Sequence, residues 1–172
     1  MRVLADKIDM PRIQLDTEIK SRLSSVFDVL PSQGVECFLS MLDQSADVIA
    51  ESAAINLEKP YGTNDIVALE PEYGISFLRM KPGQSTSFHK HAMRKEFFLV
   101  LKGELELRNG EEARRLGSGE TANSTPTIPH SLSNPGVEDL WVLEIFIPGL
   151  LNDKSRLEDR YDRATGEVGY LQ

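Results

Sequence analysis

From about residue 56 onwards, the chain is a series of short apolar and alternating runs separated by Gly, Pro and Asn. No helical pattern interrupts them, and runs of this kind are typical of β-strands. The expected strands cover residues 65–70, 74–80, 85–92, 96–103, 104–109, 112–117, 127–133 and 140–147. So many short strands at close spacing predict an antiparallel all-β sandwich or barrel.

The clearest turn signal in this region is the pair Asn109-Gly110, which lies between two alternating runs. Asn-Gly is a preferred pair for tight turns between antiparallel strands. The sequence therefore predicts a hairpin that joins residues 104–109 to residues 112–117.

The residues before 56 follow a helical period instead. Apolar residues recur at helical spacing between residues 16 and 31, and a second apolar stripe runs from about Ser32 to Ala53. Pro31 ends the first run. The pattern predicts a helical hairpin that packs on the rest of the chain or on a second subunit. We expect a helical extension over 1–55, the barrel over 56–150, and a segment over 151–172 that leaves the sheet, holds a short helix and closes on the barrel.

Composition limits the partners and the compartment. The net charge is −8 and the pI is near 4.9, which argues against binding to nucleic acid or to an anionic membrane surface. Cys37 is the single cysteine, so no intrachain disulfide forms. The first residues lack the apolar run of a signal peptide, and no stretch reaches the ~18 apolar residues that span a bilayer. We therefore expect a reduced, cytoplasmic protein.

Two of the three histidines, His89 and His91, lie two residues apart in an expected strand, so their side chains point to the same face. Glu96 begins the next strand and returns alongside them if the two strands pair. His130 lies in another expected strand, which brings a third imidazole to the same place if it runs beside the first pair. Three imidazoles and one carboxylate suit Zn, Mn, Fe, Co or Ni better than Ca or Mg.

The segment 83–103 reads G-x5-H-x-H-x4-E-x6-G and so resembles the first motif of the cupins. The second cupin motif, G-x5-P-x-G-x2-H-x3-N, matches at Gly119, His130 and Asn134, whereas Thr125 replaces its proline and Thr127 its second glycine. The resemblance implies a jelly-roll cupin barrel (a double-stranded β-helix) with a metal inside its mouth. The two departures concern the turn before His130.

Over residues 58–163 the chain also resembles the cupin domain of type II phosphomannose isomerases. The matching stretches are "EKPYG", "MKPGQSTSFHKHAMRKE", "NPG", "LEIF" and "RLEDRYDR". The departures are Tyr61 for tryptophan, Met93 for a histidine, Phe97 and Phe98 for a His-Trp pair, and Asp162 for glycine. They leave the expected metal ligands intact but alter the substrate side.

An aldose-ketose isomerase needs a group that moves a proton, and all three histidines are already assigned to the metal. Our candidate is Glu144, a charged residue in the apolar run 140–147. If Val142, Glu144 and Phe146 face the barrel interior, burial raises the pKa of Glu144 toward the range of a base. If the alternate residues face inward, Glu144 is merely solvated.

The resemblance leaves substrate recognition to cationic and aromatic side chains. Candidates near the C-terminus are Arg160 and Arg163, which are able to hold a phosphate or sugar carboxylate or simply form salt bridges in the tail. Lys90 lies beside the metal motif with Arg94 and Lys95, in a group that serves either anion binding or a solvated turn. Tyr61 is the candidate for stacking on a sugar.

The strand 96–103 is apolar on both faces, because Phe97, Leu99 and Leu101 alternate with Phe98 and Val100. One face fills the barrel, and the other requires cover from the N-terminal helices or from a second subunit. We expect a homodimer formed through this sheet.

The metal ligands and the resemblance together imply a metal-dependent aldose-ketose isomerase of a sugar or sugar phosphate. The alternatives are a non-haem Fe(II) dioxygenase, since the same donors leave open positions on iron, and a non-catalytic module that binds a carbohydrate or small acid.

Overall fold

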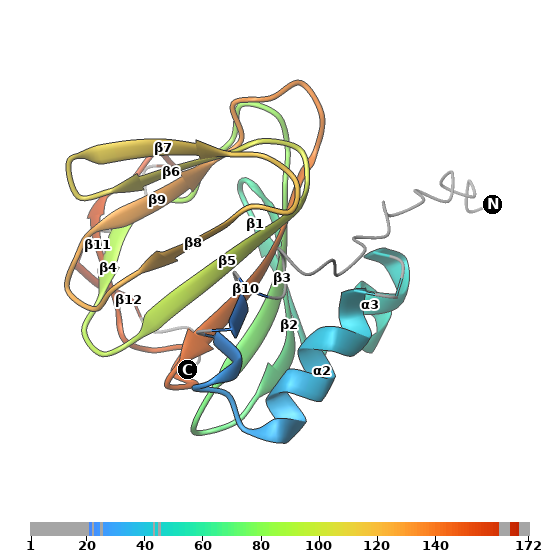
Figure 1. The fold of residues 1–172 in the computed structure, drawn as a ribbon. Helices are drawn as coiled ribbons and strands as arrows, with labels where there is room; N and C mark the ends of the chain where they lie inside the picture. Colours follow the sequence, from blue (N-terminus) through green and yellow to red (C-terminus); the bar gives the residue numbers. More distant parts are fainter. Residues whose placement is uncertain are drawn as a thin grey trace.

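The computed structural model describes residues 21, 23–24, 26–42, 44, 46–161 and 166–168. These residues form two six-stranded antiparallel sheets that face each other as a jelly roll, with helices on the outside of one sheet (Figure 1). The predicted all-β jelly-roll fold is confirmed. No helix among the described residues has both the length and the apolar character needed to cross a membrane.

The first sheet, called sheet A here, has the strand order β1-β2-β3-β10-β5-β8. Its strands are β1 (Ile55–Lys59), β2 (Gly62–Leu69), β3 (Gly74–Met80), β10 (Leu140–Ile147), β5 (Lys95–Lys102) and β8 (Thr121–Ser124). The second, sheet B, has the order β12-β11-β4-β9-β6-β7. Its strands are β12 (Gly166–Val168), β11 (Lys154–Glu158), β4 (Phe88–His91), β9 (His130–Ser133), β6 (Leu105–Asn109) and β7 (Glu112–Leu116).

Each expected strand has a counterpart, and β6 and β7 form the predicted hairpin, with Gly110 in the left-handed region at φ 63°. Strands β1, β8, β11 and β12 were not expected. The expectation that the chain leaves the sheet after residue 150 is wrong, because β11 pairs with β4 along its length. The sequence of β11 is short and mostly polar, so only its pairing partner identifies it as a strand.

The N-terminal region differs in part from the prediction. Instead of one helix over residues 32–53, there are two helices, α2 (Ser32–Leu42) and α3 (Ala46–Ser52). The sequence between them, Asp43-Gln44-Ser45, has the residue types of helix caps and turns. Of the other expected helix, over 16–31, residues 21, 23–24 and 26–27 are helical and residues 28–30 form a turn and a bend. Residues 16–20, 22 and 25 lie outside the described residues, so the complete helical hairpin stays a prediction.

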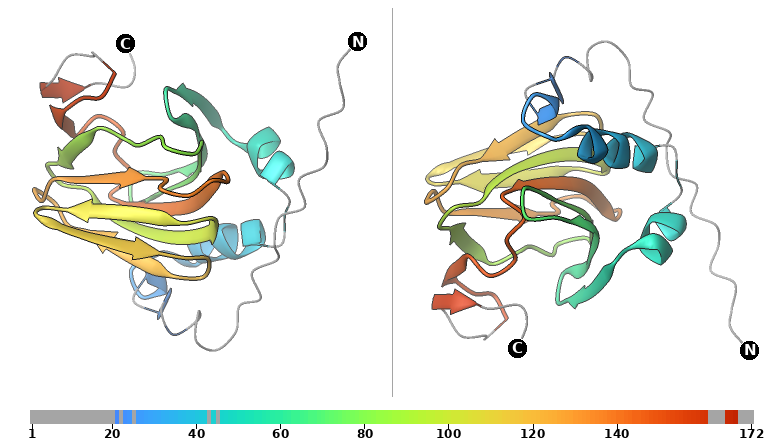
Figure 2. Two further views of the ribbon diagram at one scale, coloured as in Figure 1. Left: turned by 90° about the horizontal axis from the view of Figure 1, so that it is seen from above. Right: turned by 90° about the horizontal axis from the view of Figure 1, so that it is seen from below.

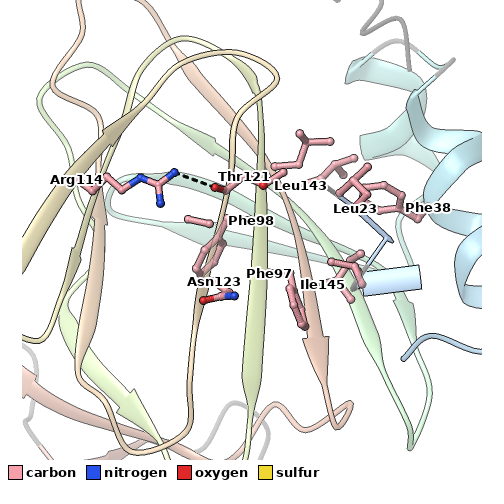
Figure 3. A pocket seen from close by; sticks show the side chains of 12 residues that line it. Leu23, Phe38, Phe97, Phe98, Arg114, Thr121, Asn123, Leu143 and Ile145 are labelled. Atoms are coloured by element: carbon pink, nitrogen blue, oxygen red, sulfur yellow. Dashed lines mark hydrogen bonds between the residues drawn. The ribbon is translucent and has the colours of Figure 1, made fainter. Parts of the chain in front are cut away.

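The outer face of sheet A is covered by residues of the same chain. Phe97, Leu99 and Leu101 of β5 share one apolar core with Leu23 and with Phe38 of α2. Figures 2 and 3 show α2 lying on this sheet, away from sheet B, with Phe97 toward the helix and Phe98 on the other side of the strand. A cavity of about 160 Å³ remains between the N-terminal region and sheet A. The sequence left open whether the N-terminal helices or a second subunit cover this face of β5. The N-terminal region provides this cover.

The barrel interior contains a second apolar core and, beside it, a polar cluster. Tyr61, Leu78, Val100 and Val142 belong to this inner core. Phe98 is part of the same core. Its ring centroid lies 6.3 Å from that of His130, which belongs to the polar cluster. The apolar core therefore closes one side of the cluster against water.

Candidate metal centre

His89, His91, Glu96 and His130 come together inside the barrel and are all buried. His89 and His91 project from β4 toward the same side, and His130 of β9 is paired directly with His89. The ring centroid of His89 lies 5.0 Å from that of His91 and 4.4 Å from that of His130. The strand that carries His130 thus runs beside the first pair, as the sequence predicted.

Glu96 reaches this cluster by a different route from the one expected. β4 and β5 do not pair, since they belong to opposite sheets. Glu96 extends across the barrel interior from sheet A, and Ser124 of the neighbouring strand β8 donates a hydrogen bond of 2.9 Å to its Oε2. The cluster therefore joins the two sheets.

The four side chains fit a divalent metal ion. One ligand atom from each lies within 4.8 Å of all the others, and ligands at 2.0–2.2 Å from an ion are separated by roughly 3 to 4.4 Å. His130 Nε2 lies 2.7 Å from Glu96 Oε2 but is buried without a properly directed hydrogen bond. A buried ring nitrogen without a hydrogen-bond partner is suited to bind a metal ion.

The outer nitrogens of the imidazoles support the same conclusion. Nδ1–H of His89 donates to the carbonyl of Ser87 at 2.7 Å, and Nδ1–H of His91 donates to Asp153 Oδ1 at 2.8 Å. His130 Nδ1 lies 3.4 Å from the carbonyl of Ile128. Because carbonyl and carboxylate oxygens only accept, each Nε2 carries a lone pair directed into the cluster. Metal-binding histidines are oriented in this way.

The charges in the cluster also favour a cation. Burial lowers the pKa of His89 well below its usual value and lowers that of His91 as well, so both rings are neutral ligands at pH 7. Burial alone raises the pKa of Glu96, but the positive charge of Arg94 overcomes this effect and holds the pKa well below its usual range. Glu96 is thus an ionised carboxylate in the barrel interior.

Glu144 faces the barrel interior, so the first of the two orientations left open for β10 is the correct one. It is 4% exposed, and Ser76 donates a hydrogen bond of 2.7 Å to its Oε2. Burial, together with the charge of Glu96, raises the pKa of Glu144 to about 7. Its environment is that of a group able to accept and return a proton near neutral pH.

Arg94 is more deeply involved than the sequence suggested. Its guanidinium is buried, and Nη2 contacts Glu96, His91 Nε2 at 3.3 Å and Glu144 Oε1 at 3.3 Å. Its Cζ lies 4.3 Å from the ring centroid of Phe146. The sequence placed Arg94 in a cationic group with a solvated turn as one interpretation, and burial excludes that interpretation for Arg94.

Asp153 is a site residue that the sequence analysis missed. Oδ1 accepts from His91, while Oδ2 accepts from the backbone N–H of Arg94 at 2.9 Å and of Met93 at 3.2 Å. A single carboxylate thus fixes a histidine ring and the turn after it. It lies 62 residues from His91 in the sequence, and no local pattern marks it.

The structure does not bring the expected substrate-binding residues to the cluster. Tyr61 is buried in the apolar inner core. Lys90 alternates with the two histidines along β4, so its side chain lies on the opposite face of the strand. Arg160 is exposed in a groove on sheet B with Phe88 and Arg108. Arg163 lies outside the described residues.

The turn that carries His130 keeps a left-handed backbone conformation at the position where the second motif has glycine. Thr127, which replaces a glycine of the cupin motif, has φ 68°, a conformation that β-branched residues rarely adopt. Its N–H donates to the carbonyl of His91 at 2.8 Å. Asn134 bonds the carbonyls of Met80 and Glu138 and accepts from Gly136 N–H, so its role is to shape a turn.

Comparison with known proteins agrees with this geometry. Residues 76–146 match the Cupin domain family. The alginate biosynthesis protein AlgA of Pseudomonas putida is 29% identical over 142 residues, which are 79% of this chain and 28% of AlgA. A mannose-1-phosphate guanylyltransferase of Klebsiella pneumoniae is 33% identical over 112 residues, 61% of this chain and 23% of that protein. The chain therefore spans less than a third of these relatives.

A solved structure shares the fold. An uncharacterised conserved protein with a double-stranded β-helix domain from Klebsiella pneumoniae superposes with a TM-score of 0.53 and 20% sequence identity. The match covers 64% of this chain and 95% of that one. At this identity the likeness concerns the fold alone.

Proposed function

Since the chain is a cupin, homologous to the cupin region of the phosphomannose isomerase type II family, we propose that it is a metal-dependent aldose-ketose isomerase of a sugar or sugar phosphate. His89, His91, Glu96 and His130 hold the metal, and Glu144 moves the proton. The relatives supply the substrate class by analogy, because their names refer to mannose 1-phosphate and to polysaccharide biosynthesis. The metal is one of Zn, Mn, Fe, Co and Ni.

One observation carries this proposal: a second buried carboxylate, Glu144, stands beside the four-residue cluster. The other buried carboxylates among the described residues have partners of their own. Glu96 belongs to the cluster, and Asp65 is paired with Arg79 at 3.0 Å. Asp153 accepts from His91 at 2.8 Å, and Asp159 accepts from Ser87 at 2.7 Å. Glu144 is therefore the carboxylate that remains for proton transfer. A pure metal-binding module has no need of a buried carboxylate with a raised pKa.

The isomerisation needs only proton movements. Glu144 takes the proton from the carbon next to the carbonyl, and the electron pair of that C–H bond forms the carbon–carbon double bond of an enediolate. The π electrons of the carbonyl move to its oxygen, which takes the proton of the neighbouring hydroxyl. Glu144 then returns its proton to the former carbonyl carbon, and a carbonyl forms on the other carbon. A divalent cation in the cluster would supply a Lewis acid that stabilises the negative oxygen.

We also propose that the chain acts in the cytoplasm and as a homodimer. The charge and single cysteine support the first statement. The second needs an interface other than the part of sheet A that the chain's own N-terminal region covers. Sedimentation velocity at two concentrations measures the oligomeric state.

The test is an anaerobic assay of protein reconstituted separately with each of the five metals, against a panel of aldose and ketose phosphates. We expect one metal to support interconversion of an aldose and its ketose, and Glu144→Gln to abolish turnover while metal binding persists. Glu158→Gln, which removes a 66% exposed carboxylate, is the matched control and keeps full activity. Absence of turnover with every metal and sugar refutes the isomerase.

The same assay separates the alternatives. Substrate consumption that begins only when oxygen is admitted identifies a dioxygenase. Ligand binding that leaves the sugar unchanged and is insensitive to Glu144→Gln identifies a binding module.

A further inference from the structure

Arg94 brings a positive charge to the proposed metal ligands. Its side chain is 7% exposed, and its guanidinium donates through Nε to Glu96 Oε1 at 3.1 Å and through Nη1 to the carbonyl of Leu150 at 3.1 Å. Nη2 faces acceptors on Glu96, His91 and Glu144. Three acceptors share the two hydrogens of this one nitrogen, so they compete for its hydrogen bonds.

Two of these three acceptors are atoms that a metal ion needs. His91 Nε2 has a single lone pair, and a lone pair that binds a cation is not available to a guanidinium. The Glu96 carboxylate has lone pairs for both a metal and Arg94, so with a metal in place the remaining Nη2–H of Arg94 is left with Glu144 and with whatever ligand lies next to it. A buried guanidinium with free donors is a strong site for a negatively charged oxygen.

A narrow cavity lies at this position. Arg94, Glu144 and Phe146 line it together with Asn64 of β2, and its volume is about 20 Å³. That volume accommodates one group of about the size of a water molecule. Asn64 Oδ1 is buried there without a hydrogen-bond partner. A hydroxyl group placed in the cavity would donate to Asn64 and accept from Arg94.

We propose that Arg94 and Asn64 bind neighbouring oxygens of an α-hydroxycarbonyl substrate, Arg94 the oxygen that becomes negative in the enediolate and Asn64 an adjacent hydroxyl. The inference rests on the proposed isomerase and deepens it by assigning the substrate contacts. Arg94 and Asn64 thus take the substrate-binding role that the sequence suggested for Tyr61, Lys90 and Arg160. Neither contact requires a phosphate, so the site recognises the reacting end of the sugar.

The test uses a stable analogue of the enediolate, arabinonohydroxamic acid, and its 5-phosphate. Binding to the Co(II)-reconstituted protein is measured by calorimetry, and the Co(II) affinity and visible spectrum are recorded for each variant. We expect Arg94→Met to weaken hydroxamate binding by about 10- to 100-fold, the loss typical of a hydrogen bond to a charged group. Arg94→Lys keeps the charge and loses less, and Asn64→Ala weakens binding by about 5- to 10-fold.

The Arg94→Met variant must keep or increase its affinity for Co(II), because a competing cation has been removed. Arg115→Met, at a 63% exposed arginine, is the control and binds the hydroxamate like the wild type. If Arg94→Met does not fold, Arg94→Lys and Asn64→Ala carry the test. Hydroxamate affinity within threefold of the wild type in both Arg94→Met and Asn64→Ala, or no hydroxamate binding by the Co(II) protein, overturns the inference.

A protein that is not an isomerase gives a different result. In that case no sugar turns over in the wild type, yet hydroxamate affinity still depends on Arg94 and Asn64. Similar affinities for the phosphate-free and the phosphorylated hydroxamate support recognition of the reacting end of the sugar. A requirement for the phosphate group that persists in Arg94→Met contradicts it.

Discussion

Asp153→Ala is the most informative perturbation of the site, because this side chain supports the cluster without belonging to it. Asp153 Oδ1 accepts from His91 Nδ1 at 2.8 Å, and Oδ2 accepts from two backbone N–H groups. Removal of the carboxylate frees the His91 ring to rotate or to change tautomer, so Nε2 no longer keeps its lone pair directed at the metal.

The size of the effect follows from the bond that is lost. A hydrogen bond to a charged group contributes about 1.5–3 kcal/mol, which corresponds to roughly a 10- to 150-fold change in the metal dissociation constant. The backbone N–H of Met93 adds less, because Met93 is at the surface and water replaces the lost partner. We therefore expect metal affinity to fall by about 10- to 100-fold.

The assay is a competition titration of Co(II) and Zn(II) against a chromophoric chelator at pH 7.5. Asp139→Asn removes an exposed carboxylate elsewhere and controls for the change in net charge. Asp153→Asn keeps one carbonyl acceptor and should lie between the wild type and Asp153→Ala. An Asp153→Ala protein that is folded and binds metal within twofold of the wild type refutes the assignment of Nε2 as the ligand atom of His91.

Three further predictions concern stability. Thr127→Gly relieves a left-handed backbone conformation at an exposed position, and we expect it to raise the free energy of urea unfolding by about 1 kcal/mol; a decrease would contradict the strain. Gly74→Ala places a methyl group 2.0 Å from the Phe146 ring, so the free energy of unfolding should fall by about 1–3 kcal/mol, and an unchanged value would mean that the ring moves freely. Co(II) at a hundred times its dissociation constant should stabilise the metal-free protein by about 2.7 kcal/mol, or about 5–10 °C in melting temperature, whereas a His89→Ala/His130→Ala variant should show no shift.

The local pattern was sufficient for the part of the site that depends on one strand or one turn. Because side chains alternate along a strand, the spacing of His89 and His91 alone placed both rings on one face. The glycines that frame the motifs, Gly83, Gly103 and Gly119, all have positive φ, the backbone conformation for which glycine is suited. The alternation of β5 likewise showed that both of its faces need apolar cover.

Features that depend on which strands are neighbours were beyond the sequence. β10 is apolar on both faces, so alternation did not reveal which side Glu144 faces; the helical cover on the other side decided it. Arg94 looked like part of a surface turn, and its burial follows from Phe146 in a distant strand and from the segment around Leu150.

The sequence by itself determined an antiparallel all-β sandwich or barrel and the four candidate ligands, since residue types, strand period and turn residues are local properties of the chain. Its resemblance to the cupin motifs narrowed this fold to a jelly roll. The tertiary structure decided that Glu96 comes from the opposite sheet, that Glu144 and Arg94 lie beside it, and that Asp153 of the unexpected C-terminal strand region orients His91. The contacts of Glu144 with Arg94 and of Asp153 with His91 join residues 50 and 62 positions apart, and only the packing of the two sheets brings such residues together.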